Sequence, residues 1–140
     1  MNLKKKKVLF ICTHNSVRSQ MAEGLLRSLS GERDEVYSAG TQPSRVHPLA
    51  IEVMREINID ISRQRSKNVD EFKGIIFDYV VTVCDQARES CPLFTGAKKY
   101  LHQSFEDPFV VRGDSDNIIS AFRLVRDEIK NWIDQTFYKE

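Results

Sequence analysis

The sequence predicts an α/β fold: a single three-layer domain with a four-stranded, mostly parallel sheet flanked by helices. The first observation behind this prediction is that short apolar runs, typical of buried strands, alternate with segments of helical periodicity. The second is the length of 140 residues, which suits one domain with a substantial core. No repeat or linker divides the chain, so we expect residues 1–140 to form one domain.

Four segments are predicted to be strands, and in the first and third of them apolar residues, many of them β-branched or aromatic, form continuous runs. They are residues 7–12, 34–39, 79–83 and 99–103. The third ends the most apolar run of the chain, as expected for a central parallel strand.

Helices are predicted where apolar residues recur every three or four positions. The first, residues 18–29, has Met21, Leu25 and Leu26 on one face. The second begins at Pro48, which suits a first helical position, and its apolar face extends to Ile57. The last covers residues 118–136, and residues 69–72 are predicted as a short helix.

The connection between the first strand and the first helix is the most informative segment. A strand that stops where a helix starts directs several backbone N–H groups to one point, which attracts a tetrahedral oxyanion. Arg18 can hold two oxygens of that ion in a bidentate fork. The same positive field favours thiolate over thiol, so Cys12 is predicted to be the nucleophile. The predicted oxyanion-binding residues are Thr13, His14, Asn15, Ser16, Val17, Arg18 and Ser19.

The sequence leaves alternative roles open for two residues of this loop. Cys12 could be a buried cysteine at a strand end, but such a cysteine needs no Asn, Ser and Arg after it. The hydroxyl of Ser19 can either donate a hydrogen bond to the thiolate or cap the helix.

The loop Cys12-Thr13-His14-Asn15-Ser16-Val17-Arg18-Ser19 resembles the oxyanion loop of the low-molecular-weight protein tyrosine phosphatase superfamily. The continuation Gln20-Met21-Ala22-Glu23-Gly24 and the segment Tyr37-Ser38-Ala39-Gly40 are similar to its thioredoxin-coupled arsenate reductase branch. The resemblance implies a phosphatase-like fold and reduction of arsenate to arsenite with thioredoxin as electron donor. Phosphate and sulfate would act as mimics of arsenate.

The chain has two further cysteines, Cys84 and Cys91. Cys84 follows a predicted parallel strand and should therefore lie at the same sheet edge as Cys12. Cys91 lies in a polar segment, and the pair lacks the partners of a zinc site. This placement favours thiol–disulfide exchange, in which Cys84 attacks the sulfur of Cys12 and Cys91 then attacks Cys84. The resemblance implies the same relay.

Asp107 precedes Pro108 in a predicted loop, a pair that by itself indicates only a turn. The resemblance implies that Asp107 is the general acid. Phe109 stands where phosphatases acting on aromatic substrates usually carry Tyr, which disfavours phosphotyrosine as the main substrate.

Asn15, Glu23 and Ser38 resemble positions that bind potassium in some arsenate reductases. A further acidic ligand of those relatives falls near Lys67, and an ammonium group cannot ligate a cation. Lys67 could instead take the place of the ion, and Glu23 could be a solvated helix charge. No other metal or cofactor is expected.

A net charge of +1 gives no reason to expect nucleic acid or a membrane as partner. Three cysteines argue against a disulfide framework. The apolar run after the lysines at residues 4–7 is too short for a signal peptide, so we expect a cytoplasmic protein. We also expect it to be a monomer. Two rival functions remain. A low-molecular-weight phosphatase would hydrolyse phosphate monoesters through a phospho-intermediate on Cys12, whereas a non-catalytic oxyanion or redox-sensing module would show no steady turnover.

Overall fold

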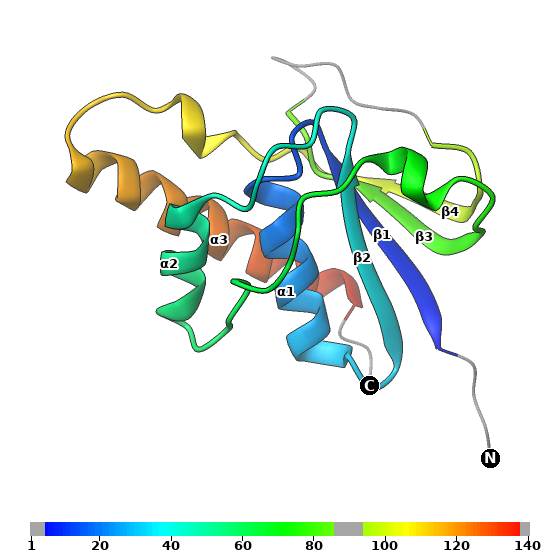
Figure 1. Ribbon diagram of the computed structural model, residues 1–140. Coiled ribbons are helices and arrows are strands. Elements are labelled where there is room, and N and C mark those ends of the chain that lie inside the picture. The colour runs from blue at the N-terminus through cyan, green and yellow to red at the C-terminus, as the bar shows by residue number, and fades with distance from the viewer. Residues whose placement is uncertain (1–4, 86–93, 138–140) are drawn as a thin grey trace.

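The computed structural model describes residues 5–85 and 94–137, which form a four-stranded sheet with helices packed against it (Figure 1). The sheet order is β2-β1-β3-β4, and all three neighbouring pairs are parallel. Its strands are β1 (Lys6–Cys12), β2 (Asp34–Gly40), β3 (Phe77–Thr82) and β4 (Ala97–His102). The predicted α/β class and single sheet are therefore confirmed. No helix within the described residues is long and apolar enough to cross a membrane.

The two faces of the sheet are covered differently. The helices α1 (Arg18–Ser30), α2 (Pro48–Arg55) and α3 (Ser115–Phe137) all lie on one side (Figure 1). Among the described residues, the other side is covered by the short 3-10 helix η1 (Val69–Phe72) and its neighbouring loops.

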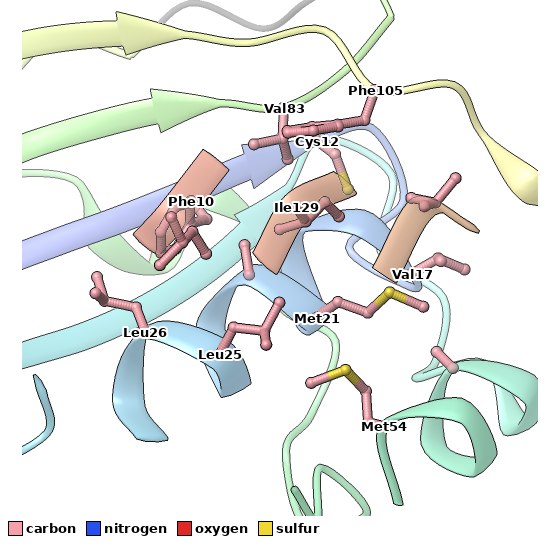
Figure 2. Packing of buried hydrophobic residues seen from close by; sticks show 14 of the residues in the cluster. Phe10, Cys12, Val17, Met21, Leu25, Leu26, Met54, Val83, Phe105 and Ile129 are labelled. Carbon is pink, nitrogen blue, oxygen red and sulfur yellow. The ribbon is translucent and has the colours of Figure 1, made fainter. Parts of the chain in front are cut away.

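From Val8 to Cys12, strand β1 is buried on both sides, which explains why this part of its sequence is continuously apolar. Val8 and Phe10 belong to the core shared with the helices, whereas Leu9 and Ile11 pack into the smaller cluster opposite. Figure 2 shows Phe10 on the helix side of the sheet, near Ile129 and Leu26. The polar loop after Cys12 therefore begins at the end of a strand that is buried in the core.

The observed element ends differ by a few residues from the predicted ones. Helix α3 begins at Ser115 rather than at residue 118, because Asp114 accepts a hydrogen bond from the Asn117 N–H and so satisfies the first turn. Strands β3 and β4 each begin two residues earlier than predicted. A second 3-10 helix, η2 (Pro108–Val110), follows Asp107.

His47 caps helix α2, a role that the sequence patterns do not reveal. Its Nδ1 accepts a hydrogen bond from the Leu49 N–H at 3.0 Å, and its ring packs between Phe109 and Phe122. Burial is the largest cause that lowers the pKa of His47 below its ordinary value of 6.5, and the charge of Arg45 lowers it further. The neutral ring is thus the form that the folded protein favours.

We expect His47 to make the protein sensitive to mild acid. Because its folded pKa lies below the unfolded value, its contribution is complete above about pH 6.5 and is lost as pH falls through the folded pKa. His47→Asn keeps a capping side chain but removes this titration. Urea unfolding at pH 7 and pH 5 should therefore show a smaller loss of stability in the variant. Equal losses in both proteins would contradict the assignment.

Candidate active site

The loop between β1 and α1 is tightly seated on the end of β2. Asn15 has a φ of 50°, in the left-handed region that Asn tolerates better than most residues. A Cβ on Gly40 would lie 2.4 Å from the Thr13 carbonyl oxygen and 2.8 Å from that of Cys12. Only glycine can therefore bring β2 so close to the loop.

A cavity of about 230 Å³ opens in front of Cys12. Its volume can hold a small oxyanion together with water. Cys12, Arg18 and Asp107 all line it, so the predicted nucleophile, anion clamp and acid share one space. The complete lining is Cys12, His14, Ser16, Val17, Arg18, Ser44, Asp107 and Phe109.

The guanidinium of Arg18 is held from the segment that follows β4. Arg18 is 2% exposed, and its Nη1 donates to the carbonyl oxygen of Phe105 at 3.1 Å. Its Nη2 lies 3.6 Å from Asp107 Oδ2. The positive charge next to Cys12 therefore has a fixed position at the cavity wall.

The side-chain amide of Asn15 has only one possible orientation. The Lys67 backbone N–H donates to its oxygen at 2.8 Å, and a backbone N–H can only donate. The Asn15 NH₂ group must then face the two serines, Ser19 at 2.8 Å and Ser38 at 3.0 Å. Both serine oxygens accept, so the hydroxyl hydrogens of Ser19 and Ser38 point elsewhere.

The hydroxyl of Ser19 is directed at the sulfur of Cys12. The two atoms are 2.9 Å apart, and Ser19 already accepts from Asn15, so its hydrogen is available for Cys12. A hydroxyl donor at this position holds the sulfur of Cys12 at the cavity wall. The structure therefore places Ser19 at the predicted nucleophile, while the start of α1 at Val17 has no side-chain cap.

Behind the loop lies a buried group of charges. Glu23 is 5% exposed, accepts the Ser38 hydroxyl and forms an ion pair with Arg27. Lys67 is 8% exposed, and its Nζ lies 3.7 Å from Glu23 Oε1. Burial is the main cause that lowers the pKa of Lys67, and the negative charge of Glu23 opposes the shift. Glu23 is thus no solvated helix charge.

Cys84 lies immediately beyond β3, at the sheet edge where Cys12 ends β1. The Val83 N–H donates to the Ile11 carbonyl at 2.9 Å, which extends the pairing of the two strands to the residue before Cys84. Cys84 is fully buried in the cluster that also holds Cys12, Val83 and Phe105, three residues labelled in Figure 2. Cys12 is free, whereas Cys84 is disulfide-bonded. The predicted third relay residue, Cys91, lies outside the described residues.

The predicted oxyanion residues do not all face the cavity. Asn15 and Ser19 are buried behind the loop, where they shape it, and Thr13 does not line the cavity. His14 is exposed, and its ring contacts the Gln42 carbonyl. The loop thus has a cavity side and a supporting side.

Three contributors to the site have no clear sequence signal. Phe105 acts through its carbonyl, which any residue possesses. Gln20 is buried, and its amide donates to the Asn15 and Arg65 carbonyls. Ser44 reaches the cavity from a loop far along the chain. Of the three, only Gln20 belongs to a segment that carries the family resemblance, although that resemblance assigns it no role.

The fold and the Cys12 loop define an α/β protein with a cysteine and an arginine at the wall of a small cavity, and comparison with known proteins identifies the family. A model for the low molecular weight phosphotyrosine protein phosphatase matches residues 7–139. The chain belongs to this family.

Similar proteins within this family include arsenate reductases. Arsenate reductase 2 of Staphylococcus saprophyticus is 46% identical over 134 residues, covering 96% of this chain and 97% of the relative. The solved structure of an arsenate reductase in the phosphate binding state superimposes with a TM-score of 0.79 and 35% identity, covering 93% and 95% of the two chains. A thioredoxin-dependent arsenate reductase of Corynebacterium glutamicum has a TM-score of 0.65 and 32% identity, with 94% and 61% coverage.

Ser19→Ala should make Cys12 less reactive at neutral pH, because a hydrogen bond to a charged group contributes about 1.5–3 kcal/mol. We expect alkylation by iodoacetamide at pH 7 to slow by roughly tenfold. The rate is followed by mass spectrometry of the Cys12 peptide. Ser28→Ala, on the exposed side of the same helix, is the matched control and should react like the wild type. Identical rates in all three proteins would refute the role given to Ser19.

Proposed function

We propose that this protein is an arsenate reductase that uses Cys12, Cys84 and Cys91 in succession and is recycled by thioredoxin. The observation that carries the proposal is the position of Cys84. A second cysteine lies beyond the strand next to that of Cys12, in the same buried cluster. A phosphatase reaction has no use for that second sulfur. The similarity to arsenate reductases along almost the whole chain supports the same assignment.

The first step is addition of arsenate to Cys12. The thiolate attacks the arsenic atom, forms an S–As bond and expels one oxygen, which Asp107 protonates so that it leaves as water. Arg18 and the amides of the loop hold the remaining oxygens and their negative charge. The shared cavity supports these roles for the three side chains.

The second step is reduction. The sulfur of Cys84 attacks the sulfur of Cys12, so an S–S bond forms while the S–As bond breaks. The electron pair of the broken bond stays on arsenic, which leaves as arsenite. Cys91 then attacks Cys84, Cys12 is released as a thiolate, and the dithiol of thioredoxin reduces the new disulfide. Two electrons from thioredoxin thus balance the change from As(V) to As(III).

A phosphatase activity through the same cradle is the second candidate, favoured by the family to which the chain belongs and by Asp107 at the cavity. Phosphate has the shape of arsenate, so a phosphate monoester could phosphorylate Cys12, and water would release the phosphate. This reaction needs Cys12, Arg18 and Asp107 but neither of the other cysteines. We propose it as a weak side activity.

A coupled assay separates the two candidates. With arsenate, thioredoxin, thioredoxin reductase and NADPH, we expect sustained NADPH oxidation only in the wild type. Without thioredoxin, Cys91→Ser should release one arsenite per chain and stop at a Cys12–Cys84 disulfide, whereas Cys84→Ser and Cys12→Ser should release none. Sustained NADPH oxidation by Cys84→Ser or Cys91→Ser would rule out the relay.

Hydrolysis of p-nitrophenyl phosphate serves as the control reaction. Cys84→Ser and Cys91→Ser should keep the wild-type rate, because they leave the cradle unchanged, whereas Cys12→Ser should lose it. Fast hydrolysis combined with the absence of arsenate reduction in the wild type would favour the phosphatase as the main function.

A further inference from the structure

We infer that the ammonium group of Lys67 is a built-in counter-ion for Glu23, which stabilises the Cys12 loop without a bound metal cation. Lys67 is therefore a positioning residue. It acts on the nucleophile only through the side chains between them. The inference rests on the proposed function only where it concerns arsenate kinetics.

The first argument is that the nitrogen groups around Glu23 are hydrogen-bond donors, which cannot ligate a potassium ion. Potassium is bound by oxygen atoms, such as those of carbonyl groups. Here the Asn15 NH₂ group faces Ser38, and an NH₂ group is a donor only. The Lys67 Nζ lies 3.7 Å from Glu23 Oε1 and donates to the Arg65 carbonyl at 2.7 Å. The residues expected to hold potassium therefore do not fit the ion here.

The second argument is that Glu23 needs a compensating cation. Its carboxylate is buried, and an unpaired buried charge is strongly unfavourable. Arg27 supplies one partner, but its side chain is 46% exposed and it faces the other carboxylate oxygen, Oε2. Lys67, with a side chain that is 9% exposed, is the cation at Oε1. The charge of Lys67 is therefore more shielded from solvent than that of Arg27, so salt screens its interaction with Glu23 less.

The third argument is that a continuous series of hydrogen bonds joins this ion pair to the nucleophile. Ser38 donates to Glu23 and accepts from Asn15, which also donates to Ser19. Ser19 in turn contacts the sulfur of Cys12 at 2.9 Å. The Glu23 carboxylate accepts at one end of this series, and the Lys67 N–H orients the Asn15 amide in its middle. A cation at Oε1 balances the charge of the carboxylate to which the series is anchored.

The backbone of Lys67 makes it possible to test the side chain alone. Its N–H donates to Asn15, and its carbonyl accepts from the Gly40 N–H at 2.9 Å. Neither bond uses the side chain, so Lys67→Ala keeps both. The variant would leave Glu23 Oε1 and the Arg65 carbonyl, the two oxygen atoms that the Lys67 ammonium contacts, facing a vacated space, and oxygen atoms are the ligands that a potassium ion prefers.

The decisive measurement is thermal unfolding of the reduced full chain in potassium chloride and in tetramethylammonium chloride at equal ionic strength. The wild type should have the same Tm in both salts. Lys67→Ala should lose roughly 5 °C or more in tetramethylammonium and regain at least half of that loss in potassium. Lys67→Arg keeps a cation and should not respond to potassium. If Lys67→Ala does not fold, Lys67→Gln takes its place in the same comparison.

The matched control is Lys73→Ala, which removes an exposed lysine that pairs with Asp70 on the surface. It should behave like the wild type. Three outcomes would overturn the inference: a potassium-specific rise of Tm in the wild type, a Tm of Lys67→Ala equal to that of Lys73→Ala, or a loss in Lys67→Ala that potassium does not reverse.

Kinetics give a second readout that a purely structural role would not change. The kcat/KM of Lys67→Ala for arsenate should rise with potassium, by about tenfold between the two salts, while that of the wild type stays constant. Because the Tm comparison needs no turnover, its result is independent of the reaction. Absence of arsenate reduction in the wild type, together with the expected Tm pattern, would refute the proposed function and leave the counter-ion role intact.

Discussion

The shape of the Cys12 loop depends on one buried amide, that of Asn15. It accepts from the backbone N–H of Lys67 and donates to Ser19 and Ser38, so it joins the loop, the first helix and the second strand. Without it, three buried polar groups would lose a partner, at about 1–3 kcal/mol each. Because these bonds also hold the left-handed turn at Asn15, the backbone of the loop is fixed without any bound ligand, as the proposed anion binding requires.

The end of strand β2 contributes to the site in two ways: one residue supplies a hydroxyl group, and another lacks a side chain. Ser38 is buried on the side of the network, and Gly40 leaves room for the carbonyl oxygens of the loop. A larger residue at Gly40 would push β2 away, and Ser38 would then lose both Asn15 and Glu23. The short run Tyr37-Ser38-Ala39-Gly40 is thus explained by distance and polarity, not only by its resemblance to other proteins.

Much of this architecture could be predicted because the spacing of apolar residues indicates which side chains are buried. Strand β1 is apolar on both faces, and the Cys12-to-Arg18 spacing marks the turn from strand to helix. Element ends were less predictable, since a single side chain such as Asp114 can start a helix earlier. Contacts made through a carbonyl, as at Phe105, could not be predicted, because the backbone is the same for every residue. Nor could the ring packing of His47, which depends on two distant aromatic residues.

The position of Arg18 links anion binding to acid catalysis in the proposed reaction. The neutral carbonyl of Phe105 accepts a hydrogen bond on one side of the guanidinium, while Asp107 only approaches the other side at 3.6 Å. An entering oxyanion brings a closer negative charge to that second side and replaces Asp107 as the partner of Arg18. The carboxyl group is then free to turn towards the bound ion, while the carbonyl still fixes the guanidinium. In the proposed reaction, the segment after β4 therefore determines both where Arg18 binds the anion and where Asp107 can protonate it. This segment lies almost ninety residues from Arg18 in the sequence.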